Sequence, residues 1–203
     1  MSIVDVLDRV AELRSALAPP AAATPPAAAT AGAGTSFSTL LQSAGAAAPM
    51  TAASTVPAGP GGAGLLAAVQ REVGVAEQPP GSNDSPRIAQ YRQATAGSGV
   101  GPWCAYFTSW AAREAGMPLG ENGQGFGRVD DVYAWAQRAG RAVPNGPGVV
   151  PRPGDLIVWD EHIGVVEAVL PDGSVQTIEG NSSDQVSRRT HEAGSALGYV
   201  RMG

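Results

Sequence analysis

The sequence predicts an α+β domain in which helices come first along the chain and an antiparallel β-sheet follows. One observation is a change of pattern at Pro151-Arg152-Pro153-Gly154, where apolar residues at helical spacing give way to strand-like alternation. Another is that the predicted strands follow one another through short connections, which is typical of an antiparallel meander. Such a sheet buries a face against a helical layer, so we expect the helices to pack on the sheet.

Composition divides the chain of 203 residues into three parts. Residues 1–18 carry apolar side chains at helical spacing and predict a short amphipathic helix. Residues 19–64 are mostly Ala, Pro, Thr, Gly and Ser without a charged residue, which predicts a disordered tether. Residues 65–203 are predicted to form the folded domain. A helix as short as residues 1–18 is marginal alone. We expect it to dock on a protein partner, to self-associate or to serve as an export address, and the apolar island at residues 36–41 is a second candidate docking segment.

The helical layer is predicted to contain four helices with recognisable start and stop signals. Ser85-Pro86 reads as an N-cap followed by a first-position proline. Asp130-Asp131 complements the helix dipole in a first turn, while Gly116 and Gly140 supply C-terminal stops. The predicted helices cover residues 65–73, 86–94, 102–115 and 129–139.

Five strands are predicted to follow, at residues 155–161, 162–170, 174–179, 185–191 and 197–202. Asp172-Gly173 joins the two central strands and is a strong hairpin signal. A two-residue loop would pair Val166 with Glu179 and Gly164 with Asn181. A three-residue loop, with the glycine of this pair as a bulge, would shift the register by one and turn Glu179 to the opposite face. The site described next requires the two-residue loop.

The single cysteine, Cys104, lies in the first turn of the third predicted helix. There the macrodipole and the unpaired backbone N–H groups favour the thiolate, the nucleophilic form. One row of this helix, made of Cys104, Thr108, Ala111 and Ala115, is small throughout, so the helix can lie close to the sheet and to a base on it. The alternative is that a lone cysteine is a small buried hydrophobe. The nucleophile hypothesis therefore requires a partner.

Two histidines are available as that partner. His162 opens an alternating strand and is the better base, whereas His191 precedes a polar turn and is predicted to be a solvated strand-end residue. In the expected register, Glu179 and Asn181 share the face of His162 and would orient its imidazole. Asp160 is a rival orienter on the same strand. We favour Glu179, because a cross-strand neighbour can reach over the ring.

Four short segments, in this order and spacing, resemble the CHAP domain, a member of the papain-like group that includes the NlpC/P60 peptidases. They are Trp103-Cys104-Ala105-Tyr106-Phe107, Pro153-Gly154-Asp155-Leu156-Ile157, His162-Ile163-Gly164-Val165-Val166 and Ile178-Glu179-Gly180-Asn181. The resemblance covers about residues 68–203. It implies a papain-like fold, with N-terminal helices packed on a C-terminal antiparallel sheet, and an amidase or endopeptidase that cuts peptidoglycan. It also assigns roles to four residues: Cys104 as nucleophile, His162 as base and then acid, Glu179 as orienter and Asn181 as a supporting polar group.

The sequence departs from the family pattern in two places. Trp103 stands where many CHAP domains have Gln or another polar residue, so the backbone N–H groups of the helix N-terminus are left to stabilise an oxyanion. The alternating acidic residues of a calcium loop are also missing, and Asn83 and Asp84 alone do not make that site. We expect neither a metal nor an organic cofactor.

Charge and hydropathy exclude other classes of partner. A formal net charge of −5 argues against nucleic acid, and no run of about 18 apolar residues predicts a membrane span. Charged residues within the first 14 positions interrupt any secretory h-region. The leading segments loosely resemble those of wall hydrolases in flagellar assembly, and a phage lysis or tail enzyme is the alternative. We therefore expect non-classical export and action at the cell wall, on its periplasmic or extracellular side.

These observations predict a tethered cysteine peptidase or amidase. Its substrate would be a stem or cross-bridge peptide of peptidoglycan, cleaved at an amide bond through a thioester intermediate. Two alternatives stay open: a module of the same fold that binds wall peptides without cutting them, and an assembly protein in which residues 1–63 carry the main role.

Overall fold

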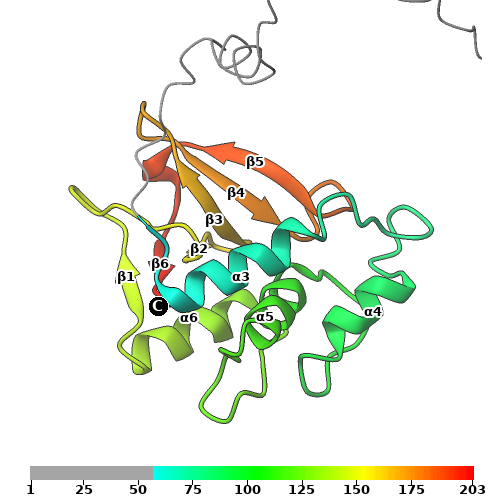
Figure 1. Ribbon diagram of the computed structural model, residues 1–203. Coiled ribbons are helices and arrows are strands. Elements are labelled where there is room, and N and C mark those ends of the chain that lie inside the picture. The colour runs from blue at the N-terminus through cyan, green and yellow to red at the C-terminus, as the bar shows by residue number, and fades with distance from the viewer. Residues whose placement is uncertain (1–56) are drawn as a thin grey trace, which may run out of the picture. The chain divides into compact units, whose positions relative to one another are not determined.

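The computed structural model describes residues 57–203, in which a helical layer is followed by a six-stranded antiparallel sheet (Figure 1). The helices are α3 (Pro60–Gln70), α4 (Pro86–Arg92), α5 (Cys104–Glu114) and α6 (Val129–Arg138). The strands are β1 (Ala142–Pro144), β2 (Leu156–Val158), β3 (Ile163–Val169), β4 (Val175–Glu179), β5 (Ser187–His191) and β6 (Gly198–Val200), with a short 3₁₀ turn, η1 (Ala193–Ser195), before β6. This arrangement confirms the predicted α+β class.

The sheet has the order β1-β6-β2-β3-β4-β5, and each neighbouring pair is antiparallel. Strand β1 was not predicted, because only three residues ending in a proline pair with β6. It lies before Pro151, so the change from helices to strands comes earlier than expected. β2 and β6 are each limited to three residues, and they are shorter than their predicted ranges.

Alternation along the strands divides the apolar side chains between the two faces of the sheet. Leu156 and Val158 join the large core against the helices, whereas Ile157 points to the other face. A smaller cluster covers that other face, and its buried members are Ile157, Val166, Val175, Ala196 and Tyr199. Helix α5 is buried from Cys104 through Ala112, since it lies among α3, α4, α6 and β3. It is the central element of the helical layer.

Helix α3 begins at Pro60 and ends at Gln70, and it therefore starts earlier than the predicted range of residues 65–73. Its first turns are rich in glycine, which made them look like part of the tether. The structure explains those glycines by close packing: a Cβ at Gly62 would lie 3.1 Å from the carbonyl oxygen of Pro153. The predictions for residues 1–18, for the tether up to residue 56 and for residues 36–41 lie outside the described residues.

The helix boundaries show which local signals were correct. The Ser85 hydroxyl accepts a hydrogen bond from the Ile88 N–H at 3.2 Å, which confirms the predicted N-cap of α4. Gly116 and Gly140 follow α5 and α6 with φ of +73° and +66°, as expected for C-terminal stops. Pro102, however, is not the first residue of α5. Trp103 is the N-cap, so Cys104 is the first helical residue.

The β3–β4 hairpin differs from the predicted pairing by two one-residue shifts in the same direction, so the register changes by two residues while the faces stay as predicted. The loop has three residues, with the Leu170 N–H donating to the Ser174 oxygen at 2.8 Å and Gly173 at φ +85°, so the predicted two-residue loop is wrong. A second irregularity between Val166 and Ala168 shifts the pairing again. Because a one-residue shift reverses the faces of a strand, two shifts restore them. Glu179 therefore returns to the face of His162, although by a route that the sequence did not reveal.

None of the helices within residues 57–203 is long and apolar enough to cross a membrane.

The contact between Gly180 and α5 generates a testable prediction about stability. A Cβ at Gly180 would lie 2.7 Å from the Cβ of Phe107, whose side chain is fully buried. We expect Gly180→Ala to lower the free energy of unfolding by about 1–3 kcal/mol, because the helix and the strand end must move apart. Gly194→Ala is the matched control, since a Cβ there meets no atom within 4 Å. Urea unfolding of both variants tests the prediction, and equal midpoints would contradict it.

Candidate active site

Cys104 is the first residue of α5, the helix that packs against β3. The residue is 5% exposed, and its Sγ lies 4.0 Å from the carbonyl oxygen of Glu161. One turn later, the Thr108 hydroxyl donates to the carbonyl oxygens of Cys104 and Ala105, at 3.3 and 3.2 Å. The sulfur therefore sits on a rigid helix with its first-turn N–H groups nearby, as the sequence predicted.

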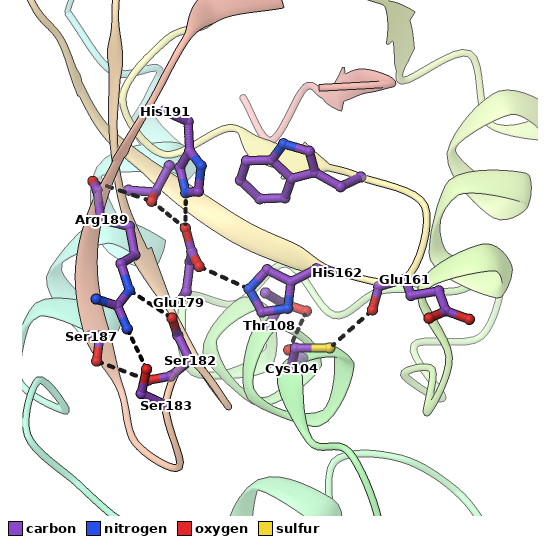
Figure 2. A network of polar contacts seen from close by, with 12 residues as sticks. Cys104, Thr108, Glu161, His162, Glu179, Ser182, Ser183, Ser187, Arg189 and His191 are labelled. Carbon is purple, nitrogen blue, oxygen red and sulfur yellow. Dashed lines mark hydrogen bonds and ion pairs between the residues drawn. The ribbon is translucent and has the colours of Figure 1, made fainter. Parts of the chain in front are cut away.

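His162 lies between the thiol and a carboxylate, directly before β3 (Figure 2). Its Nε2–H donates to Glu179 Oε2 at 2.9 Å, which leaves the other ring nitrogen for the thiol proton. Burial lowers the pKa of His162, but contacts with Cys104 and Glu179 outweigh burial and raise the pKa to about 9. The structure thus favours an imidazolium beside the sulfur at neutral pH.

The carboxylate of Glu179 is almost completely buried, with 3% of the side chain exposed. Burial raises the pKa of Glu179, but hydrogen bonds from His162, Thr177 and His191 outweigh it and lower the pKa to about 2. Glu179 is therefore ionised over the whole physiological range. A Cβ at Gly164 would lie 2.7 Å from the Cγ of Glu179, so the glycine provides the space that the glutamate occupies.

Asn181 is not beside the imidazole as the predicted pairing required. With its amide oriented to satisfy both neighbours, its oxygen accepts from the Trp103 backbone N–H and its nitrogen donates to Glu77 Oε1, each at 3.2 Å. The Trp103 indole N–H donates to the same Glu77 oxygen at 2.9 Å. Asn181 and Glu77 together hold Trp103, the fully buried residue that precedes Cys104.

Asp160, the rival orienter, is exposed, and Glu179 makes the polar contact with His162 instead. The sequence interpretation missed His191. It was expected to be solvated, yet its Nε2 lies 2.6 Å from Glu179 Oε1. The only local sign of this contact in the sequence was that His191 lies on the predicted strand that follows Glu179. Its reach to Glu179 depends on the register of β4 and β5.

A cleft of about 640 Å³ opens beside Cys104. Residues of the loop before α5, the start of α6 and the turn between β2 and β3 line it, and the charged members are Arg128, Asp130, Asp160 and Glu161. The cleft is large enough for a few residues of an extended peptide. Among residues 57–203 no group of three or more His, Cys, Asp or Glu side chains is arranged to hold a metal ion.

Residues 95–181 match the model of the CHAP domain family. This part of the chain is a CHAP domain. The match contains Cys104, His162, Glu179 and Asn181 and ends before β5. A CHAP domain implies a cysteine-dependent peptidoglycan hydrolase of the amidase or peptidase class that acts at the cell wall. No curated protein and no solved structure matches the chain.

The raised pKa of His162 predicts how stability depends on pH. An imidazolium held by Cys104 and Glu179 contributes its full stability below the ordinary pKa of 6.5, and this contribution is lost as the pH rises through about 9. We expect the unfolding free energy of the native protein to exceed that of His162→Gln by an amount that shrinks between pH 6.5 and 9. Denaturant melts across this window measure the difference, and a constant difference would contradict the prediction.

Proposed function

We propose that the CHAP domain hydrolyses an amide bond of the wall peptide, with Cys104 as nucleophile, His162 as general base and then acid, and Glu179 as orienter of the imidazole. The observation that carries the proposal is the row of thiol, imidazole and buried carboxylate beside an open cleft. Each member has the environment that its role requires: the thiol lies at a helix N-terminus, the imidazole is held in a fixed orientation, and the carboxylate is ionised.

The chemistry begins from the imidazolium of His162, which in this proposal already holds the proton of the Cys104 thiol. The sulfur attacks the carbonyl carbon of the scissile amide, and the imidazolium then gives its proton to the leaving nitrogen. This step releases an amine and leaves a thioester on Cys104. Water loses a proton to His162, attacks the thioester carbonyl and releases a carboxylic acid with the thiol restored. Glu179 remains ionised throughout and stabilises the imidazolium.

The oxyanion of the tetrahedral intermediate requires hydrogen-bond donors, and the backbone of α5 is their source in this proposal. The first N–H groups of a helix have no intrahelical acceptor, so those of Cys104 and Ala105 are suited to a developing negative charge. The Trp103 N–H is committed to Asn181 instead. Asn181 therefore acts as a supporting polar group by fixing the backbone next to the nucleophile.

Loss of the thiol tests the function directly. Cys104→Ala should lower the hydrolysis of purified cell walls by on the order of 10³-fold or more, because attack on the carbonyl becomes impossible. Binding of the variant to the same walls should persist, since the cleft is intact. Turbidity loss and pelleting assays measure the two properties. Unchanged hydrolysis by Cys104→Ala would overturn the proposal, and binding without hydrolysis by the native protein would favour the non-catalytic module.

Mass spectrometry of the digested wall distinguishes the amide bonds that fit this chemistry. An N-acetylmuramoyl-L-alanine amidase releases stem peptides free of sugar, whereas an endopeptidase leaves shortened stems on the glycan or opens cross-bridges. We expect one of these product sets to appear with the native protein and to be absent with Cys104→Ala. A product set that is the same for both would show that the activity belongs to a contaminant.

The proposed pairing of Cys104 with His162 can be tested without a substrate. We expect iodoacetamide to alkylate Cys104 more slowly at pH 7 in His162→Ala than in the native protein, because the imidazolium no longer favours the thiolate. The rate should become similar in the two proteins at high pH, where the thiolate forms in both. Equal rates at pH 7 would show that the two side chains do not act as a pair.

The context of the activity rests on residues outside the described part of the chain. A protein partner for residues 1–18 or 36–41, a flagellar or phage setting and non-classical export all stay predictions from sequence. Action on peptidoglycan follows from the CHAP domain alone.

A further inference from the structure

We propose that His191 is a positioning residue that holds the carboxylate of Glu179 in the orientation required by His162. The inference rests on the proposed function, and it adds a residue that lies beyond the segment matching the CHAP family, residues 95–181. His191 does not touch the reacting atoms; it acts through Glu179.

The two oxygens of Glu179 are bound by two different imidazoles. Oε2 accepts from His162 at 2.9 Å, and Oε1 lies 2.6 Å from His191 Nε2 (Figure 2). A carboxylate held at one oxygen can rotate about its terminal bond, but one held at both oxygens cannot rotate without breaking a contact. His191 therefore restricts the rotation that would misdirect Oε2.

The path of the Glu179 side chain supports a specific contact with His191. In the β4–β5 pairing, Glu179 lies opposite Ser187, and His191 lies opposite Val175 at the other end of the ladder. The nearest cross-strand partner does not bind the carboxylate, because the Ser187 hydroxyl donates to the Ser182 oxygen at 3.0 Å. The glutamate runs back over Thr177, whose hydroxyl donates to Oε1 at 2.5 Å, to meet the histidine.

The His191 ring is itself held in place. The Trp159 ring lies 4.5 Å from it, centroid to centroid, and 5.8 Å from the ring of His162. The indole N–H of Trp159 donates to the Ser195 hydroxyl at 3.2 Å, which fixes the tryptophan. One aromatic side chain thus borders both imidazoles that bind Glu179, so the second histidine belongs to the same packed unit as the first.

Without His191, the buried Oε1 of Glu179 keeps the Thr177 hydroxyl as its remaining side-chain donor. The carboxylate then turns more freely and holds His162 less firmly. Substrate contacts in the cleft beside Cys104 are unaffected, because His191 is not among the residues that line it. The loss should therefore appear in kcat and not in KM.

The test compares His191→Ala with His191→Gln, which retains an N–H donor, and with Thr190→Ala as control. Thr190 is an exposed neighbour on the same strand. We expect His191→Ala to lower kcat for wall-peptide release by about 10–100-fold, as when a residue that orients a functional side chain through a hydrogen bond is lost. KM should change less than about twofold. His191→Gln should recover part of this loss, and Thr190→Ala should match the native protein.

A second measurement needs no substrate. The alkylation rate of Cys104 by iodoacetamide between pH 6 and 9 should change in His191→Ala in the same direction as in Glu179→Gln, because both variants loosen His162. A histidine that served only to stabilise the sheet would leave this profile unchanged in any variant that remains folded.

A folded His191→Ala protein with native kcat and a native alkylation profile would overturn the inference. Should that variant fail to fold, His191→Leu, which fills space without donating, is compared with His191→Gln, and equal kcat and alkylation in these two would overturn it as well. The proposed function fails separately, if Cys104→Ala remains active or the native protein does not cut walls. The alkylation profile still decides the role of His191 in either case.

Discussion

A buried carboxylate is the constraint on which the candidate site depends. Glu179 is ionised although its side chain is almost completely removed from water, and an ionised group in such a place must be satisfied by donors. Its donors are His162, Thr177 and His191, which come from the start of β3, from β4 and from β5. One charged group is thus held by side chains from three neighbouring strands of the sheet.

Helix α5 connects this point to the nucleophile. Because it is buried along most of its length, its position is set by the core and not by the site. The residue before Cys104 is fixed in addition by a small polar cluster, in which Glu77 and Asn181 bind the Trp103 side chain and backbone. The thiol is therefore presented by a rigid element to a base whose orientation is equally restricted, which is the preorganisation that acyl transfer requires.

The β3–β4 hairpin shows why sequence reasoning can be right about a site and wrong about its geometry. Asp172-Gly173 correctly indicated a tight turn, but a loop of three residues with a glycine at positive φ competes closely with one of two. The further shift between Val166 and Ala168 has no clear local signal, since a bulge depends on how the strand curves in the assembled sheet. Only the two irregularities together return Glu179 to the face of His162.

Local patterns by themselves determined that helices precede strands, that Cys104 occupies a first helical turn and that His162 stands at a strand start near an acidic partner. These features follow from helix and turn signals that act over a few residues. The tertiary structure decided what depends on contacts between distant segments: the early start of α3 against Pro153, the place of Asn181 beside Trp103, and the contact of His191 with Glu179. The side chain of Glu179 runs back along β4 to His191, a partner that neither the spacing in the sequence nor the pairing of β4 with β5 specifies. The reason is that the packed core leaves space for the buried carboxylate at one place, and the donors at that place are the ones that satisfy it.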